Sequence, residues 1–398
     1  MLMRQAIYTY PWDILDDPRA PEHIKSMGFD EVSLAASYHA TRAWTPHNPR
    51  RSLVDARHAA VYWKVNRDLY QASGLVPEAP EWMESSDSFG EALMALRGAG
   101  LKVNAWVVVT HATVLGRKHP DRVIINAFGD LYTYALCPSN PNVLAYAAAL
   151  LGELTAGYDL DGIEMEACGY LRADHDSLHE KRGVHFDEFH LALLSLCFCE
   201  TCVELMAAHG ADADRVRGLI VDRLRDYVSS GAGPAGQLEV QLEAVLGRDA
   251  EPVLEARDLA VRSLMDSALS LIPPNNRPEV FFHAYPNRLV SGAMVGASSS
   301  TLIDRSDGVI LALSELSPTR VTTAIQQARS LLDMRVPVIA AFDVTESQGR
   351  KGVKSLNAQF LAAVDAQANA LRYYHYGLAS PHRLREVESL VHRLSRGP

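Results

Sequence analysis

Eight short apolar runs, separated for the most part by helical patterns, constrain the fold of this chain more than any other feature. Each run is rich in β-branched or aromatic residues, and together they cover residues 6–10, 31–36, 101–109, 162–165, 280–284, 308–313, 336–342 and 370–374. Strands that alternate with helices form parallel β-α-β units, and eight such units fit a closed barrel better than an open sheet. We therefore expect an α/β protein of the (β/α)8 TIM-barrel class.

The alternative is a doubly wound open sheet. No Gly-x-Gly-x-x-Gly motif follows the first apolar run, so the dinucleotide-binding version of that fold has no support. The chain has 398 residues, a length that allows two domains or one large barrel, and 48% of its residues are hydrophobic, enough for a sizeable core. We predict a single barrel domain over residues 1–398.

Two connections in this pattern are unusually long. Residues 38–88 follow the second strand, and residues 167–278 follow the fourth strand and contain amphipathic helical segments such as 216–228 and 254–271. Both connections follow the carboxyl end of a strand, the end at which barrel enzymes carry their active sites. We expect both to shape a substrate pocket, with a purely stabilising helical insertion as the alternative for residues 167–278.

Charge and hydropathy exclude several classes of partner. The net charge is -10, and the nearest approach to a basic block is Arg50-Arg51, so a nucleic-acid partner is not expected. No apolar stretch is long enough to span a bilayer, and the N-terminus lacks the pattern of a signal peptide. The sequence thus predicts a cytoplasmic protein without a membrane partner, and it leaves self-association into a homo-oligomer open.

The strongest catalytic signal lies in the fourth run and its last residue, Asp161-Gly162-Ile163-Glu164-Met165-Glu166. Side chains alternate along a strand, so Glu164 and Glu166 point to one side, and we expect both to project into the barrel mouth. Two adjacent carboxylates raise the pKa of at least one of them, as general acid/base catalysis requires. The alternative is a structural pair of glutamates bound to arginines of the barrel.

Other strand ends supply further candidates. Asp343 ends the seventh strand and Glu315 follows the sixth, so each is a candidate second carboxylate. Aromatic rings stack on the apolar faces of sugars, and histidines bond their hydroxyls, so a carbohydrate ligand is expected. The candidate binding residues at or near strand ends are Tyr10, Trp12, Tyr38, His39, His47, Trp106, His111, His283, Tyr285 and His375. For any one of them, core packing is the alternative.

Three of the five cysteines crowd into the segment Cys197-Phe198-Cys199-Glu200-Thr201-Cys202. In a cytosolic chain, such crowding favours metal binding over disulfides. The alternative is a set of buried, reduced cysteines, which behave as small hydrophobic residues.

This cysteine segment resembles one in the family 42 β-galactosidases, which bind zinc with a Cys-Tyr-Cys-x-x-Cys segment and a cysteine segment before the fourth strand. Here Leu136-Cys137-Pro138-Ser139-Asn140-Pro141 is similar to the earlier segment. The resemblance implies a structural Zn²⁺ held by Cys137, Cys197, Cys199 and Cys202, with Cys168 as the alternative fourth ligand. Four thiolates form a closed site that leaves no position for a catalytic water.

The fourth strand also resembles known catalytic strands. The chitinase motif Asp-Gly-x-Asp-x-Asp-x-Glu aligns with Asp161, Gly162, Glu164 and Glu166, but its final glutamate falls on Cys168, which argues against a chitinase mechanism. Family 42 enzymes carry an Asn-Glu pair whose glutamate is the acid/base, and Met165-Glu166 is similar in place. Residues 38–40 and 46–50 look like those of glycoside-hydrolase-like barrel proteins of uncharacterised activity.

We therefore expect a glycoside hydrolase that acts on a small soluble glycoside or oligosaccharide, with Glu166 as general acid/base and Glu164 in support. Asp343 or Glu315 would be the second carboxylate, and the separation of the carboxyl groups would decide between retention and inversion. One alternative is a metal-dependent sugar isomerase or lyase, whose divalent cation would be held by His39, His111, Glu164, Glu166, His283 and Asp343. A sugar-binding pseudoenzyme is the other.

Overall fold

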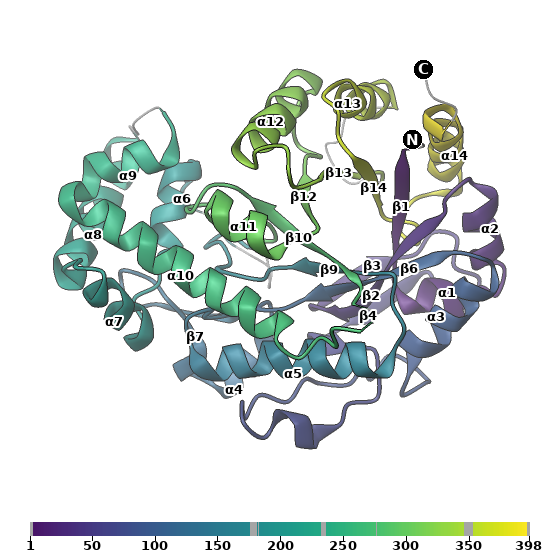
Figure 1. Cartoon of the computed structure of the whole chain (residues 1–398), viewed down its shortest axis with the longest axis horizontal. Helices are drawn as coiled ribbons and strands as arrows, with labels where there is room; N and C mark the ends of the chain where they lie inside the picture. The colour runs from purple at the N-terminus through teal and green to yellow at the C-terminus, as the bar shows by residue number, and fades with distance from the viewer. Residues whose placement is uncertain are drawn as a thin grey trace.

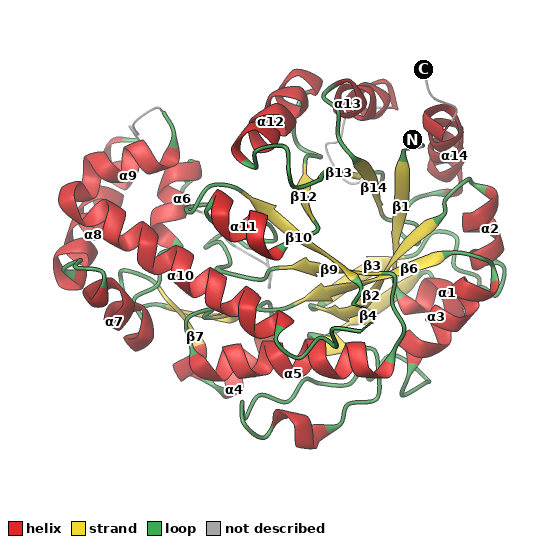
Figure 2. Ribbon diagram, viewed as in Figure 1, coloured by secondary structure: helices red, strands yellow, loops and turns green. Residues whose placement is uncertain are grey.

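Eight parallel strands close into a barrel (Figures 1 and 2). The computed structural model describes residues 3–175, 181, 183–231, 236–275, 277–345 and 353–395, without the side chains of 353–355. The strands are hydrogen-bonded in the order β1-β14-β13-β12-β10-β9-β6-β2, and β2 pairs with β1 to close the ring. Their bounds are β1 Arg4–Thr9, β2 Glu31–Tyr38, β6 Lys102–Val108, β9 Gly162–Glu166, β10 Glu279–Tyr285, β12 Gly308–Ala312, β13 Val338–Asp343 and β14 Ala370–Tyr374.

These strands confirm the predicted (β/α)8 barrel. Each of the eight apolar runs overlaps one barrel strand, and the differences are confined to the ends. The fourth strand, for example, extends one residue beyond the predicted run and ends at Glu166. Strand ends are set by which backbone groups find a partner, so apolar runs locate them only approximately.

Helices surround the strands, as Figure 2 shows in red. Those that follow or precede barrel strands are α1 Pro11–Leu15, α2 Ala20–Ser26, α3 Ser88–Gly98, α4 Thr113–Lys118, α5 Pro141–Gly157, α11 Ser299–Arg305, α12 Pro318–Leu331, α13 Val353–Asp365 and α14 Pro381–Ser395. The start of α5 illustrates the local sequence signals. The side chain of Asn140 accepts a hydrogen bond from the backbone N–H of Asn142, and proline occupies the first helical position.

The connection after β9 forms a group of helices on one side of the barrel, at the left of Figure 1. Their bounds are α6 Glu188–Leu194, α7 Glu200–Ala208, α8 Ala213–Ser230, α9 Leu238–Leu246 and α10 Ala250–Leu269. The first half of α10 buries Val253 and Leu254 in a core formed by these helices. Its second half buries Leu264 and Ala268 in the main core, between the barrel and its helices. One helix therefore ties the insertion to the barrel.

The connections after β2 and β6 contain small antiparallel pairs. After β2, β3 Thr41–Trp44 pairs with β4 Leu53–Ala56, and β5 Ala60–Val61 adds to the edge of β2. After β6, β7 Val123–Ile125 pairs with β8 Leu131–Leu136. The sequence did not predict these strands, because pairs this short depend on the surface they lie on rather than on their own pattern.

The barrel interior contains an apolar cluster and a group of polar and charged side chains. The apolar cluster comes from β10, β12, β13 and β14 and consists of Phe281, Ile310, Ile339, Ala341 and Ala370. The polar and charged group contains Glu31, Asn104, Glu164 and Arg372, all buried. Gly162 makes room for this layer, because a Cβ there would lie 2.5 Å from the Asn104 side-chain oxygen.

None of the helices within the described ranges is long and apolar enough to cross a membrane.

Candidate active site

Glu166 is the last residue of β9 and lies at the carboxyl ends of the strands. Its side chain is partly exposed, and Oε2 accepts a hydrogen bond of 2.7 Å from the indole N–H of Trp106 on β6. The indole is itself buried. A buried donor fixes the carboxylate in position, and the partial exposure of the side chain allows it to meet a ligand.

Four tyrosines surround this carboxylate and the indole. The hydroxyl of Tyr374 lies 3.2 Å from that of Tyr10 and 3.3 Å from that of Tyr38. The Trp106 ring has four tyrosine rings within 6.0 Å, centroid to centroid, namely those of Tyr8, Tyr10, Tyr38 and Tyr374. Residues from β1, β2, β6 and β14 thus converge on an aromatic floor, of which Tyr374 is partly exposed.

Asp343 reaches the same floor from β13. It is the strand partner of Tyr374, and its Oδ1 accepts hydrogen bonds of 2.6 Å from both the backbone N–H and the hydroxyl of Thr345. Burial raises the pKa of Tyr374, and the negative charges of Glu166 and Asp343 raise it further. The two carboxylates therefore both act on one phenol at the mouth.

Glu315, the other candidate for a second carboxylate, is exposed on the loop after β12. Of the two candidates, Asp343 is the one that lies with Glu166 around the aromatic floor.

Glu164 points inward as predicted, but it does not reach the mouth, and this corrects the sequence-based expectation. It is fully buried, and its Oε1 accepts a 2.6 Å hydrogen bond from Nε of Arg372, which is also fully buried. Asn104 donates to the same oxygen at 3.3 Å, and Glu31 lies 3.7 Å from the same guanidinium. Glu164 lies two residues earlier on the strand, which places it one layer deeper in the barrel.

His283 on β10 connects this inner layer to the mouth. Its Nε2 lies 3.1 Å from the hydroxyl of Tyr8, and the pair is buried. Burial lowers the pKa of His283, while the charges of Glu166 and Glu164 raise it. The charges of both glutamates therefore act on this predicted binding residue.

Three histidines form a second cluster beside Glu166. His39 follows β2 and its ring stacks on His111, 4.5 Å between centroids, while His111 Nδ1 lies 3.1 Å from His175 Nε2. Burial lowers the pKa of His39, a hydrogen bond with the Ala40 carbonyl oxygen raises it, and the charge of Glu166 raises it further. Burial and the two neighbouring imidazoles lower the pKa of His111. His39 and His111 were predicted, and His175, from the loop after β9, was not.

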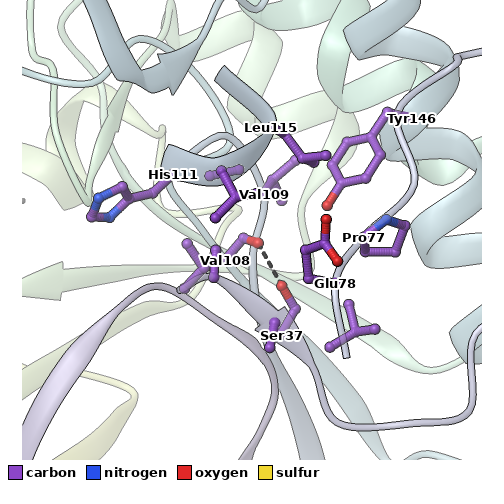
Figure 3. A pocket seen from close by; sticks show the side chains of 13 residues that line it. Ser37, Pro77, Glu78, Val108, Val109, His111, Leu115 and Tyr146 are labelled. Carbon is purple, nitrogen blue, oxygen red and sulfur yellow. Dashed lines mark hydrogen bonds between the residues drawn. The ribbon is translucent and has the colours of Figure 1, made fainter. Parts of the chain in front are cut away.

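A small pocket lies beside this cluster rather than in the mouth. Ser37, Glu78, His111 and Tyr146 help to line it, and the Ser37 hydroxyl donates to the Val108 carbonyl oxygen at 2.8 Å (Figure 3). Figure 3 shows the His111 imidazole pointing away from Glu78 and Tyr146. The imidazole therefore belongs to the histidine cluster, and only its flank borders the pocket.

Some of the predicted binding residues are buried or bonded to the backbone away from the barrel mouth. Trp12 and His375 are fully buried on either side of Tyr10, with ring centroids 4.3 and 4.1 Å from it, so they support the floor from beneath. His47 Nε2 bonds the carbonyl oxygen of Tyr376 instead of facing Glu166. Residues that follow a strand end can turn under the neighbouring loops, and strand periodicity does not reveal this.

Tyr285 is partly exposed at the end of β10, where its hydroxyl donates to Gln327 at 3.4 Å. Burial raises its pKa, and the charge of Glu188 on α6 raises it further.

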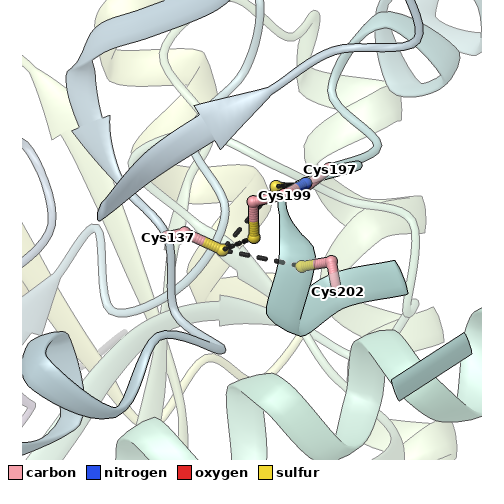
Figure 4. Close-up of side chains that lie close together, drawn as sticks. All are labelled: Cys137, Cys197, Cys199 and Cys202. Atoms are coloured by element: carbon pink, nitrogen blue, oxygen red, sulfur yellow. Dashed lines mark hydrogen bonds between the residues drawn. The ribbon is translucent and has the colours of Figure 1, made fainter. Parts of the chain in front are cut away.

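The four predicted cysteines come together (Figure 4). The sulfur of Cys137 lies 3.7 Å from that of Cys197, 3.5 Å from that of Cys199 and 3.6 Å from that of Cys202. In a tetrahedral site with metal-sulfur bonds of about 2.3 Å, neighbouring sulfurs are about 3.8 Å apart. The cluster therefore has the dimensions of a four-thiolate metal site.

The surroundings of the cysteines also fit a metal. Backbone N–H groups of Ile125 and Cys199 point at the Cys197 sulfur at 3.4 Å. Burial raises the pKa of Cys137 and Cys197, so a cation is needed before buried thiolates become stable there. Cys168 lies outside the group, which leaves Cys137 as the fourth member.

Sequence reasoning named Tyr8 at the end of the first strand but missed Arg372 and Tyr374 as parts of this site. A signal for Arg372 was present, because it is a charged residue within the apolar run of β14, and a buried charge requires a partner. Tyr374 lies two residues after Arg372 and therefore on the same side of the strand. An inward-pointing Arg372 thus predicts an inward-pointing Tyr374.

Comparisons with known proteins agree with the fold. No family model and no curated protein matched the sequence. Among solved structures, the glycoside hydrolase domain of PgaB (BpsB) from Bordetella bronchiseptica is similar with a TM-score of 0.58 and 13% identity, covering 98% of each chain. An α-L-fucosidase isoenzyme 2 from Paenibacillus thiaminolyticus has a TM-score of 0.57 and 12% identity over 99% of this chain. A β-galactosidase from the psychrophilic Marinomonas ef1 has a TM-score of 0.57 and 9% identity over 98% of this chain.

This chain spans 49% of the fucosidase chain and 59% of the galactosidase chain. The resemblance to family 42 is thus not supported by a family match. At these identities, the likeness to three carbohydrate-active enzymes establishes that the chain has their barrel fold.

Proposed function

We propose that the protein is a glycoside hydrolase whose active site is the barrel mouth around Glu166. The observation that carries the proposal is that Glu166 and Asp343 end the barrel strands β9 and β13, and that the charges of both raise the pKa of the partly exposed Tyr374. A pair of carboxyl groups that can flank a glycosidic bond is what glycoside hydrolysis requires. The solved structures with a similar barrel include a fucosidase and a galactosidase, which supports this reaction class.

In this proposal Glu166 is the general acid/base, held by Trp106. Asp343 is the second carboxylate, and Thr345 orients it through two hydrogen bonds. Tyr374 and His39 are the partly exposed rings beside Glu166 and are the proposed sugar contacts, with His283 and His111 behind them. Glu164 is a positioning residue that acts through Tyr8 and His283 from the inner layer.

We also propose that the cysteine cluster holds a structural Zn²⁺. Cys137, Cys197, Cys199 and Cys202 would supply four thiolates, and a cation bound there contributes folding energy rather than a catalytic water. The support is the sulfur geometry and the two backbone N–H groups aimed at Cys197.

The metal-dependent alternative has less support. Within the described part of the chain, only the four cysteines are grouped closely enough to hold a metal, and the mouth residues are not. The ring stacking of His39 on His111 also leaves their nitrogens poorly placed to share one cation.

A screen of aryl glycosides tests the proposal. The protein should release the phenol from at least one neutral monosaccharide glycoside, and Asp343→Asn should lower that rate by at least about 10²-fold. Glu315→Gln is the matched control, because it removes the other candidate carboxylate. Loss of activity in Glu315→Gln but not in Asp343→Asn would contradict the assignment.

A further inference from the structure

Arg257, in the middle of α10, is a buried cation next to the cysteine cluster. Its guanidinium lies over the ring of Tyr170, 4.2 Å from the centroid, and the Tyr170 hydroxyl lies 3.3 Å from the Cys202 sulfur. The same small cavity is lined by Tyr170, Cys197, Cys202 and Arg257. The guanidinium, the phenol and the sulfurs therefore form one contiguous group.

Within the described residues, the hydrogen-bond partners of this guanidinium are carbonyl oxygens and a hydroxyl, and none is a carboxylate. Its Nε donates to the Arg288 carbonyl oxygen at 2.7 Å, and Nη2 donates to the Val290 carbonyl oxygen and the Ser291 hydroxyl. Nη1 is buried without a hydrogen-bond partner. A buried cation is costly unless a negative charge lies close by. Four thiolates around one divalent cation carry a net charge of about −2, and supply that charge.

The backbone that Arg257 holds leads directly to the proposed acid/base. Residues 288–291 continue into Gly292, whose N–H donates to the Tyr170 carbonyl oxygen at 3.0 Å. The next residue, Ala293, accepts a 2.9 Å hydrogen bond from the N–H of Ala167, the residue after Glu166. The path from the cysteines to the end of β9 is therefore made of consecutive contacts.

Ala167 needs this support. Its φ of 51° lies in the left-handed region, which costs a residue with a side chain about 1 kcal/mol or more. The Thr110 N–H and hydroxyl both donate to its carbonyl oxygen, at 3.0 and 2.7 Å. A conformation of this kind persists only where several contacts enforce it, so loss of one of them should displace the end of β9.

We propose that Arg257 is the counter-ion of the cysteine metal centre and that, together with Tyr170, it couples metal occupancy to the position of Glu166. The inference rests on the proposed metal site and on Glu166 as the mouth carboxylate. In this proposal the metal centre helps to position the end of β9, and with it Glu166, in addition to stabilising the insertion.

The first test measures zinc affinity by competition with a chromophoric chelator. Arg257→Met removes the charge and keeps the length of the side chain, and it should weaken zinc binding about 10- to 100-fold, as loss of an outer-shell partner does. The matched control is Arg217→Met, because Arg217 lies over the ring of Phe198 at 5.1 Å and bonds its carbonyl oxygen. It should change the affinity less than about threefold. Equal effects of both variants would overturn the counter-ion role.

The second test uses a milder variant, since Arg257→Met could fail to fold. Tyr170→Phe removes only the hydroxyl next to the Cys202 sulfur. In Co²⁺-loaded protein it should shift the sulfur-to-cobalt charge-transfer bands, whereas Arg217→Met should leave them in place. Bands identical to those of the unmodified protein would mean that Tyr170 does not contact the centre.

The third test follows the coupling without any assay of activity. The chain has five tryptophans, and the indole N–H of Trp106, assigned by its loss in Trp106→Phe, reports on Glu166 by NMR. Zinc removal should shift this resonance in the unmodified protein, and Arg257→Met should shift it with zinc bound. A Trp106 signal insensitive to zinc would overturn the coupling, even if the protein proved to be an active glycosidase. A sensitive signal in a protein without glycosidase activity would leave the coupling intact.

Discussion

Glu164 and Glu166 lie two residues apart on one strand and on the same side of it, yet they belong to different regions of the molecule. Glu164 is fully buried and bonded to Arg372 and Asn104 in the interior of the barrel. Glu166 is partly exposed at the mouth, where the Trp106 indole donates a hydrogen bond to its Oε2. A buried carboxylate that is paired with a guanidinium contributes to the fold, and a partly exposed carboxylate at an opening can exchange protons with a ligand.

The largest expected effect concerns the mouth. Glu166→Gln should preserve the fold and lower the turnover of glycosides with poor leaving groups by about 10²–10⁴-fold, the usual contribution of a positioned proton donor. Activated aryl glycosides need less protonation and should suffer less in their first step. Steady-state kinetics on a pair of glycosides with different leaving groups measures this difference. Full activity on both substrates would transfer the acid/base role elsewhere.

Substitutions in the barrel interior should change the stability of the protein and not the proton transfer at the mouth. Arg372→Met leaves Glu164 as an uncompensated buried charge, and the free energy of unfolding should fall by about 3–5 kcal/mol. Adding Glu164→Leu should recover much of the loss, because the pair is then replaced by apolar groups. Urea denaturation of the two single variants and the double variant measures this coupling. Losses that simply add would show that the two side chains do not depend on each other.

The third prediction concerns the cysteine cluster, which lies in the insertion and before α5 and not in the barrel mouth or interior. Cys199→Ser should release the metal from a protein that otherwise holds about one zinc per chain, and should lower the midpoint of thermal unfolding. Cys168→Ala is the matched control, because Cys168 is buried but lies outside the cluster. Elemental analysis and calorimetry measure both quantities. Retention of zinc by Cys199→Ser would exclude it as a ligand.

The remaining prediction concerns the pH dependence of stability and rests on Asp13, a buried carboxyl group beside Tyr10. Its Oδ2 accepts a hydrogen bond from the Tyr10 N–H, and burial raises its pKa from 3.8 to about 8. Between these values the unfolded chain has released the proton and the folded chain retains it. The stability from this group is therefore complete below about pH 4 and is lost as the pH rises toward 8.

Asp13→Asn should flatten this dependence, so the variant should gain stability relative to the unmodified protein on going from pH 5 to pH 8. Urea midpoints at the two pH values check this, with the exposed Asp30→Asn as control. The same slope in both variants would show that Asp13 is ionised in the folded protein.

The difference between Glu164 and Glu166 also marks the limit of what the sequence could predict. Alternation along a strand defines the side on which a residue lies, so the eight strands and the inward direction of both glutamates followed from local pattern. Depth within the barrel depends on register with neighbouring strands. The partner of Glu164 is 208 residues away in the sequence, and such a pairing has no local signature.

The cysteine cluster was predictable for the opposite reason. Three of its members lie within six residues, so their spacing alone indicates a common metal ion. Cys137 is the one member that comes from a distant part of the sequence. The sequence does not distinguish the two proposed second carboxylates, because Asp343 ends one strand and Glu315 follows the neighbouring strand. The proposal for Asp343 rests on its pairing with Tyr374 and on the effect of its charge on the pKa of that tyrosine.

The most direct test of the account is a crystal structure of Glu166→Gln with a slowly cleaved aryl glycoside bound. The account predicts that the glycosidic oxygen lies within hydrogen-bond reach of residue 166, that the anomeric carbon faces Asp343, and that the sugar ring lies against Tyr374. The Arg372–Glu164 pair should remain closed beneath it. A sugar bound outside the mouth, or one that opens this pair and bonds Glu164 directly, would contradict the division of roles between the two glutamates.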